Sequence, residues 1–175
     1  LRSADGSVLR GYIVYKVWHR RGRRIARIVR KLLEFSGGGP EEAICRDVRQ
    51  VIENVGDLLN LSIAKEKAYS LGVKLPAMPP VGISPDELKQ IAINILKNSI
   101  QALERKGHIG VAAEVDEERG RAALRFSDDG RGMSSEELSR AFDPFFTTKS
   151  GGEGTGLGLS LVYGLVEKNG GSIDI

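Results

Sequence analysis

Cysteine, histidine and long apolar runs are all scarce in this sequence of 175 residues, which has one cysteine, Cys45, and two histidines. A single cysteine excludes an internal disulfide and a metal site built from several cysteines, and it favours a reducing compartment. No stretch approaches the ~18 uncharged apolar residues of a transmembrane helix, and no signal-peptide pattern is present. We therefore expect a cytoplasmic chain without membrane contact, and leave open whether a full-length protein is membrane-anchored.

The charge is distributed unevenly along an otherwise ordinary globular composition, with 41% hydrophobic and 28% charged residues. Residues 1–36 contain ten Lys or Arg and two acids, whereas the rest has an excess of acids. A basic arm can bind nucleic acid. However, the basic residues of 18–35 surround an apolar stripe that includes Ile25, Val29 and Leu32, which is the pattern of a bundle helix with a solvated basic face. We therefore expect no nucleic-acid partner.

The order of the expected elements predicts an α+β fold. Residues 8–18 are rich in β-branched and aromatic residues, so we expect a strand before the amphipathic helix. The segment Gly37-Gly38-Gly39-Pro40 then marks a domain boundary. Downstream, periodicity and capping residues predict short strands at 43–48 and 73–75, helices at 48–71 (capped by Gly72), 84–105 and 157–168, and strands at 108–115, 121–127 and 172–175. This order predicts a mixed, mainly antiparallel sheet with helices on one face.

Two motifs follow the helix start at Ser84-Pro85-Asp86-Glu87, which has the residues of a capping box. Asn94 and Asn98 lie one turn apart on that helix, and a carboxamide oxygen can bind a hard cation. The alternative is a solvated polar face. Next, the sequence DDGRGM follows a strand. Asp128 at the strand end can accept a hydrogen bond from an exocyclic amine, and the glycines allow close backbone approach. The alternative is a plain Asp-Gly turn.

Two further motifs complete the set. The sequence FDPFFTTKS places Lys149 after two adjacent phenylalanines, where its ammonium could meet a phosphate, or the segment could be a surface loop. The sequence GGEGTGLGLS leads into an apolar helix, and the N–H groups at a helix start bind phosphate. It lacks the Lys-Ser/Thr of a P-loop and the position of a Rossmann turn.

Taken in order, these four motifs resemble the N, G1, F and G2 boxes of two-component sensor histidine kinases, most closely the nitrogen-regulator-like branch. The resemblance covers the ATP-binding catalytic domain at residues 37–175, with one more strand expected after Ile175. The sequence RIARIVRKLLEFS resembles the second helix of the dimerisation and phosphotransfer hairpin, so residues 18–36 would be an incomplete part of that domain. Residues 1–17 resemble the tail of a PAS-like sensor domain.

The resemblance implies the Bergerat-type two-layer α/β sandwich of the GHKL ATPases, preceded by an amphipathic dimerisation helix. It implies that Asp128 binds the adenine amino group and that Gly130 and Gly132 let the backbone close on the base. Asn98 would coordinate Mg²⁺ between the phosphates of ATP, supported by Asn94. Lys149 and the segment 132–154 would form a lid, and the triphosphate would be lined by Gly154, Thr155, Gly156, Leu157 and Gly158.

The implied function is transfer of the ATP γ-phosphate to a histidine on a dimerisation hairpin, and onward to an aspartate of a response-regulator receiver domain. A homodimer through the dimerisation helices is expected in the full-length protein. The alternative is a hydrolysing GHKL ATPase that works as a nucleotide-gated clamp. Those relatives carry a general-base glutamate where this chain has Asn94, which favours the kinase. Neither His19 nor His108 has the expected acidic neighbour, so we expect no catalytic residue in this chain.

Overall fold

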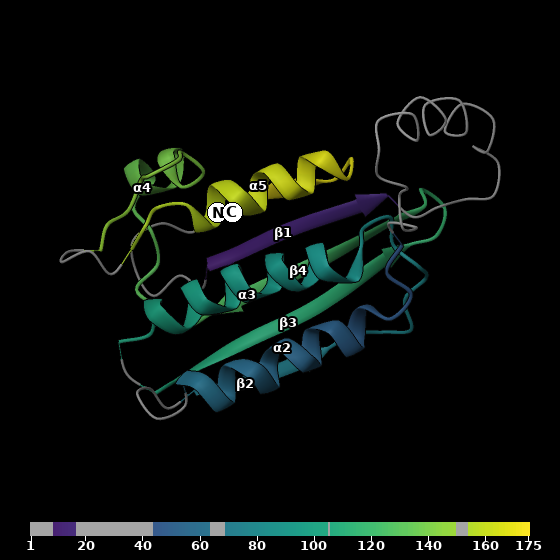
Figure 1. Cartoon of the computed structure of the whole chain (residues 1–175), viewed down its shortest axis with the longest axis horizontal. Helices are drawn as coiled ribbons and strands as arrows, with labels where there is room; N and C mark the ends of the chain where they lie inside the picture. The colour runs from purple at the N-terminus through teal and green to yellow at the C-terminus, as the bar shows by residue number, and fades with distance from the viewer. Residues whose placement is uncertain (1–8, 17–43, 64–68, 105, 150–153) are drawn as a thin grey trace, which may run out of the picture.

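The computed structural model describes residues 9–16, 44–63, 69–104, 106–149 and 154–175. Helices α2, α3 and α5 lie on one face of a five-stranded sheet, and the short helix α4 stands apart near the start of α5 (Figure 1). The elements are β1 Leu9–Lys16, α2 Val48–Ile63, β2 Tyr69–Lys74, α3 Pro85–Ala102, β3 Gly107–Asp116, β4 Arg121–Asp128, α4 Ser135–Arg140, α5 Gly158–Lys168 and β5 Ser172–Asp174.

The sheet is mixed, with the strand order β2-β3-β4-β1-β5. Strands β2 and β3 are parallel, and every other neighbouring pair is antiparallel. This arrangement confirms the predicted α+β class, with a mixed sheet and helices on one face. The predicted helix at 18–36 lies outside the described residues.

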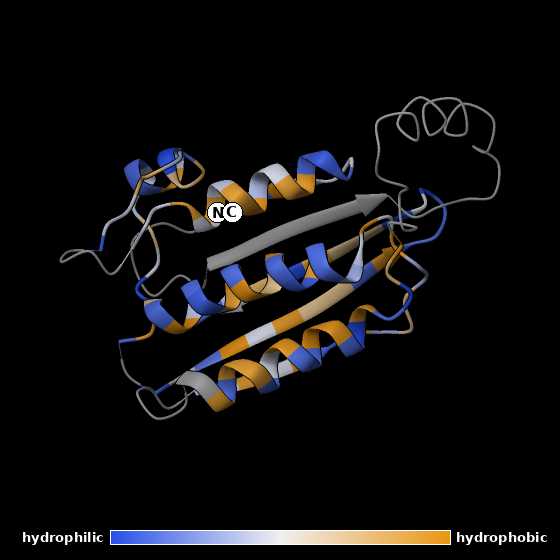
Figure 2. Ribbon diagram, in the orientation of Figure 1, coloured by the Kyte–Doolittle hydropathy of each residue, from blue (hydrophilic) through white to orange (hydrophobic). Residues whose placement is uncertain are grey.

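The core forms between the helices and the sheet because apolar residues alternate along the strands. In β4 the residues Ala122, Leu124 and Phe126 are buried, while the residues between them are half-buried. Helix α3 contributes a complementary face that includes Leu88 and Leu96. In Figure 2 the ribbon is coloured as mainly hydrophobic along β3 and on one side each of α2 and α3, and as mainly hydrophilic on the opposite sides of these helices. Burial of each large aliphatic side chain contributes about 1.5–3 kcal/mol.

Helix α3 starts as the sequence predicts. The Ser84 hydroxyl accepts a hydrogen bond from the backbone N–H of Glu87, and Pro85 occupies the first helical position. The Glu87 carboxylate accepts hydrogen bonds from Lys168 (2.7 Å) and Asn169 (3.2 Å), which ties α3 to the end of α5. Burial favours a higher pKa for Glu87, but these hydrogen bonds outweigh it and lower the pKa.

Two local expectations differ from the structure. The predicted helix at 48–71 ends as α2 at Ile63, and Tyr69–Lys74 form β2, so Gly72 is a strand residue and not a helix cap. A β-carbon on Gly72 would lie 2.9 Å from the ring of His108 on the paired strand, so the glycine makes room across the sheet. The predicted strand at 43–48 is only a bridge between Cys45 and Val81.

Strand β1 lies within the sheet, between β4 and β5. All eight of its residues pair with β4, from Leu9 opposite Asp128 to Lys16 opposite Arg121, and the central part pairs with β5. We expected residues 1–17 to resemble the tail of a PAS-like sensor domain, and the structure pairs residues 9–16 of this segment with β4 and β5. The physical reason is that an extended segment here satisfies the backbone groups at the edges of both β4 and β5.

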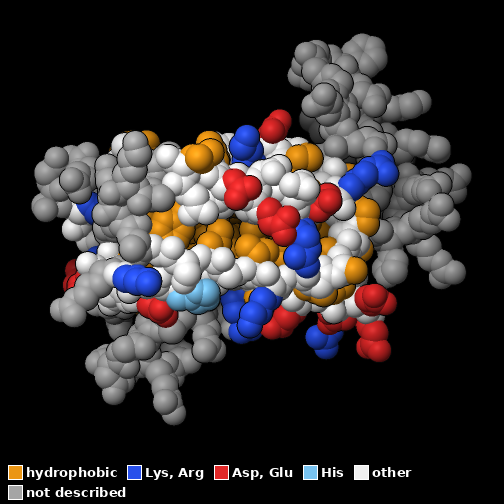
Figure 3. All heavy atoms as spheres, turned by 90° about the horizontal axis from the view of Figure 1, so that it is seen from below, with side chains coloured by type: hydrophobic (Ala, Val, Ile, Leu, Met, Phe, Trp, Pro, Cys, Tyr) orange, Lys and Arg blue, Asp and Glu red, His pale blue; other side chains and the backbone are white. Residues whose placement is uncertain are grey.

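The opposite edge of the sheet is formed by β2, beside α2. Viewed from that side, apolar side chains form a seam bordered by charged residues (Figure 3). Leu58 and Leu61 of α2 are among the exposed apolar residues. Across the described part of the chain, none of the helices combines the length and apolar character needed to cross a membrane.

Ile13→Pro tests whether β1 supports the sheet. Ile13 pairs with Leu124 of β4 and Ile173 of β5, and proline in a central strand removes a ladder hydrogen bond. We expect a loss of about 1–3 kcal/mol in unfolding free energy, measured by urea denaturation. Leu9→Pro, at the first residue of the strand, is the control and should cost less. Equal stability of the wild-type and Ile13→Pro proteins would contradict the placement of β1.

Candidate functional site

Two adjoining cavities open between α3, the end of β4 and the start of α5. They share Asn98, Ala102, Met133 and Leu159 in their walls. One cavity is narrow and almost entirely apolar. The other is wider and is lined by amide, hydroxyl and cationic side chains together with the glycines of residues 154–158. The combined site therefore offers a narrow apolar space that leads into a polar one.

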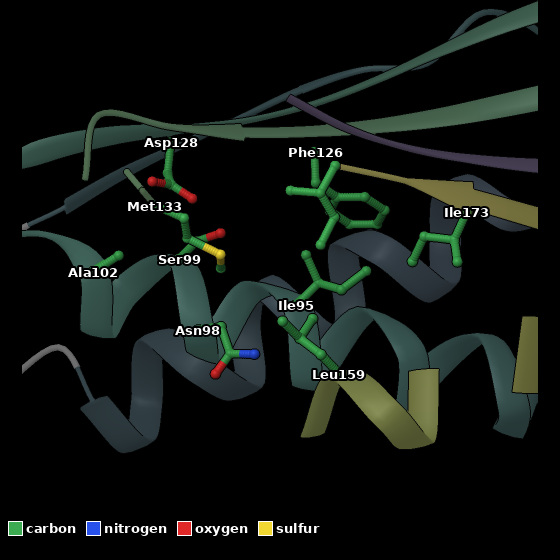
Figure 4. A pocket seen from close by; sticks show the side chains of 10 residues that line it. Ile95, Asn98, Ser99, Ala102, Phe126, Asp128, Met133, Leu159 and Ile173 are labelled. Carbon is green, nitrogen blue, oxygen red and sulfur yellow. The ribbon is translucent and has the colours of Figure 1, made fainter. Parts of the chain in front are cut away.

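The apolar cavity lies between α3 and the sheet. Figure 4 shows Ile95 and Phe126 in its middle, with Asp128 toward one end and Ile173 toward the other. Ile173 belongs to β5, and β5 pairs with β1, so the N-terminal strand supports one wall of the cavity. Such a space fits a planar ring system whose edge can hydrogen bond at one end.

Asp128 is the charged residue among the described residues that line this apolar cavity, and it is only 7% exposed. Its Oδ1 accepts a hydrogen bond from the N–H of Gly130 at 3.0 Å, which fixes the carboxylate at the end of β4. The turn is docked against α3, because the N–H of Arg131 donates to the carbonyl of Ala102 at 3.2 Å. A β-carbon on Gly130 would lie 2.7 Å from that of Ala102, so only glycine allows this approach.

The amide side chains of α3 face the polar cavity. Asn94 donates from Nδ2 to the carbonyl of Gln90 at 2.8 Å, and Asn98 lies one turn further along. The ammonium of Lys149 reaches across from the segment after α4 and contacts Asn98 Oδ1 at 3.4 Å. The same ammonium donates a hydrogen bond to Gln101 Oε1. The structure thus brings the predicted Lys149 and Asn98 together.

The phenylalanine and glycine motifs cross in direct backbone contact. The N–H of Phe145 donates to the carbonyl of Gly156 at 2.9 Å, and both residues have positive φ angles, 67° and 65°. A β-carbon on Gly156 would lie 2.3 Å from the carbonyl carbon of Phe145. A β-carbon on Gly154 would lie 2.4 Å from the hydroxyl of Thr147. These glycines therefore pack the two segments together as well as lining the cavity.

Helix α5 begins at this crossing, and the side chain of its N-cap residue, Leu157, makes no capping hydrogen bond. The hydroxyl of Thr155, two residues before Leu157, accepts a weak hydrogen bond from the Leu157 N–H at 3.4 Å. Gly158, the first helical residue, lies against the amides of α3: its β-carbon position is 3.3 Å from Asn94 Oδ1 and 3.7 Å from Asn98 Nδ2. The positive end of α5 therefore faces the polar cavity beside these amides.

Helix α4, which the sequence did not predict, is held at the rim of the site. Ser134 and Glu137 form a capping box at its start. The Arg131 guanidinium donates to Glu137 at 2.9 Å and to the Thr148 hydroxyl at 2.7 Å. The hydrogen bonds from Arg131 and from the Ser134 backbone lower the pKa of Glu137. Arg131 thereby links α4 to the residues next to Lys149.

All the residues predicted for the site lie around these cavities. Asp128 lines the apolar cavity, and Gly130 lies in the turn beside it. Asn94, Asn98, Gly132, Lys149, Gly154, Thr155, Gly156 and Gly158 line the polar one, and Leu157 lies between the last two of these glycines. The sequence did not lead us to Gln101 and Arg131. Gln101 could have been found, because it follows Asn98 by three residues and so lies on the same helix face.

The geometry agrees with comparisons to known proteins. Residues 83–175 match the family model described as histidine kinase-, DNA gyrase B-, and HSP90-like ATPase. This match covers more than half of the chain, so the chain belongs to that ATPase family. Membership of this family implies that the chain binds ATP.

The curated relatives that the chain matches include sensor histidine kinases and a sporulation kinase. The sensor histidine kinase ZraS of Klebsiella oxytoca is 34% identical over 158 residues, covering 90% of this chain and 34% of ZraS. Sporulation kinase E of Bacillus subtilis is 32% identical over 153 residues, covering 85% of this chain and 20% of that kinase. The chain thus spans about a third or less of the curated relatives' length.

Solved structures show the same fold. The catalytic domain of histidine kinase ThkA, in a nucleotide-free form, is 26% identical with a TM-score of 0.61, over 74% of this chain and 82% of that domain. Sequence and structure together show an ATPase domain of this family, similar to the catalytic domains of histidine kinases. The predicted Bergerat-type sandwich is confirmed by this likeness.

Gly156→Ala tests the backbone crossing. Alanine is strained at a positive φ by about 1–2 kcal/mol, and its β-carbon would meet the Phe145 backbone. We expect a lower melting temperature and about a tenfold or larger loss of ADP affinity in calorimetry. Gly164→Ala is the matched control, because nothing lies within 4 Å of its β-carbon in the middle of α5. In the control the free energy of unfolding should rise by about 0.5–1 kcal/mol, because alanine is favoured over glycine in the middle of a helix. Similar effects of both substitutions would contradict the crossing.

Proposed function

We propose that this chain binds Mg²⁺–ATP and donates its γ-phosphate to a histidine on a helical hairpin. The observation that carries the proposal is the junction of the two cavities at Asn98. An adenine ring fits the apolar cavity, and phosphates fit the polar cavity beside the start of α5. The identity of the nucleotide rests on the ATPase family, and the roles of single residues rest on their place around the junction.

Asp128 is proposed to select adenine. Its carboxylate is buried at one end of the apolar cavity, where an exocyclic amine can donate to it. Gly130 and Gly132 bring the backbone close to the ring, and Gly132 has a φ of 73° that other residues rarely adopt. A buried acceptor with a charge discriminates strongly against a ring that offers no donor.

Asn98 is proposed to bind Mg²⁺ through its side-chain oxygen, with Asn94 supporting it from the preceding turn. The residues fit a cation, because Asn98 Oδ1 already accepts a hydrogen bond from the positively charged Lys149 ammonium at 3.4 Å. An amide oxygen is a suitable hard ligand and adds no charge beside the phosphates. When bound, Mg²⁺ would neutralise part of the phosphate charge. Lys149 and the N-terminus of α5, with Gly154, Thr155, Gly156, Leu157 and Gly158, would hold the phosphates themselves.

The same cavity is poorly equipped to hydrolyse ATP. Asn94 is an amide whose Nδ2 donates to Gln90, so it cannot take a proton from water. The one carboxylate among the described residues lining the polar cavity is Glu137, and it is occupied by Arg131 and the Ser134 backbone. The relatives reported above give no support to a clamp ATPase. The site therefore fits a phosphoryl donor that waits for another nucleophile.

Exposed apolar residues beside the cavity could bind a helix, and that helix would carry the nucleophile. Phe145 is 74% exposed, and Leu157 and Leu161 are 42% and 41% exposed. Phe145 also has a positive φ, a conformation that costs energy and is common at functional sites. A histidine on an amphipathic helix that covers these residues would reach the mouth of the polar cavity.

The phospho-acceptor is proposed to come from outside the described residues. His108 is on β3, with its Nδ1 3.0 Å from the Ser70 hydroxyl, and lines neither cavity. His19 lies outside the described residues. We propose that residues 18–36 contribute a dimerisation helix, that the full-length protein is a homodimer, and that a response-regulator receiver domain accepts the phosphate.

Asp128→Asn should weaken ADP binding about ten- to a hundredfold, because an amide replaces the charged acceptor for the adenine amine. The carboxamide oxygen of the variant can still accept from Gly130, so the turn should persist. Asp129→Asn is the matched control, since the neighbouring Asp129 is exposed and bonds the His108 backbone. Calorimetry with ADP and GDP is the measurement. Unchanged ADP affinity in Asp128→Asn would refute the assignment.

The whole reaction is tested with radiolabelled ATP and a purified kinase hairpin that carries a histidine followed by an acid. We expect acid-labile label on the hairpin, little free phosphate, and no label on His19 or His108. Replacing the hairpin's histidine with glutamine is the control and should abolish labelling. Steady release of free phosphate without hairpin would instead support a hydrolysing ATPase.

A further inference from the structure

The ammonium of Lys149 lies where two carboxamide oxygens of α3 converge. One is Asn98 Oδ1, at 3.4 Å, and the other is Gln101 Oε1. Asn98 and Gln101 are three residues apart and therefore on the same helix face. Two neutral oxygens around one positive charge form a small cation site, and in this state a side chain of the protein fills it.

The backbone around Lys149 is anchored separately from its side chain. The Lys149 N–H donates to the Thr147 hydroxyl at 3.2 Å, and the Thr148 hydroxyl accepts from Arg131 at 2.7 Å. The four-carbon stem of lysine can therefore turn to a new partner while the backbone stays near α3. A phosphate group of a bound nucleotide would be such a partner, because Lys149 also lines the polar cavity.

We propose that Gln101 is a positioning residue that holds Lys149 on Asn98 as long as no Mg²⁺ is bound there. Mg²⁺ must then displace the ammonium from the oxygen that it needs. Gln101 stabilises the states without Mg²⁺, both empty and with metal-free nucleotide. It therefore lowers the apparent affinity for metal-bound nucleotide by the fraction of molecules in which Lys149 is held. This inference rests on the metal role of Asn98 proposed above.

Gln101 should affect the affinity for metal-bound nucleotide and leave the affinity for metal-free nucleotide unchanged. Without Mg²⁺, Lys149 can stay on Asn98 and Gln101 and still neutralise nearby phosphate, so Gln101 should have little influence. With Mg²⁺, the cation and the ammonium compete for one oxygen. A residue with a merely structural role in α3 would affect both forms equally.

Gln101→Met removes the acceptor and keeps the length and helix propensity of the side chain. We expect the variant to bind Mg²⁺–ADP about two- to fivefold more tightly than the wild type does, which is the range expected for loss of a partly exposed charged contact. The affinity for ADP in EDTA should be unchanged. Calorimetry under both conditions is the measurement. Gln90→Met, at an exposed position earlier on α3, is the matched control and should change neither affinity.

The dependence on Lys149 is tested with a double mutant. Lys149→Met has its own effect on affinity, but the added Gln101→Met substitution should then give no further gain. Weaker Mg²⁺–ADP binding in Gln101→Met would overturn the inference, because Gln101 would then be a ligand itself. An undiminished gain in the Lys149→Met background would overturn it too, as would unchanged affinity in Gln101→Met.

Two further measurements keep this inference apart from the proposed function. Asn98→Ala should remove the difference between Mg²⁺ and EDTA, and a persisting difference would overturn the metal role of Asn98 and the inference with it. An absence of nucleotide binding by the wild type would overturn the proposed function as a whole. Normal wild-type binding with a silent Gln101→Met substitution would overturn the inference alone.

Discussion

The packing of α3 against the sheet is the contact on which the site depends. Its apolar face, with Leu88, Ile91, Leu96 and Ile100 fully buried, fixes the rotation of the helix about its axis. That rotation turns the edge with the asparagines toward the start of α5 and the end with Ala102 toward the Asp128 turn. A rotation by one residue, about 100°, would bury the amides and expose the aliphatic residues at a cost of several kcal/mol.

The second constraint is close backbone contact, and it explains why glycines recur around the nucleotide. Gly130 fits against Ala102, and Gly156 fits against the Phe145 backbone. Each contact joins two different segments of the chain, so the cavity walls come from α3, the β4 turn, the segment after α4 and the start of α5. Backbone N–H groups and side chains from all of these can then act together on one polyphosphate, while Lys149 already occupies the oxygen of Asn98.

Strand β1, at the beginning of the described chain, also supports the cavity walls. Because β5 joins the sheet through β1, Ile173 forms the end of the apolar cavity only when residues 9–16 are in place. The N-terminal segment is thereby coupled to the nucleotide site through backbone hydrogen bonds. The same property makes the placement of β1 unpredictable from sequence: its alternation indicates a strand, but neither its partners nor its sheet follows from a local pattern.

Local sequence was enough to establish the four motifs, the capped start of α3 and the class of fold, because these depend on spacing, capping and the order of elements. It also placed Asn94 and Asn98 on one helix face. Tertiary contacts were needed to establish that Gly72 lies in a strand, that β1 pairs between β4 and β5, and that Lys149 reaches Gln101. These contacts join residues that are 38 to more than 100 positions apart. They are set by the burial and backbone pairing of the whole chain, which no local pattern specifies.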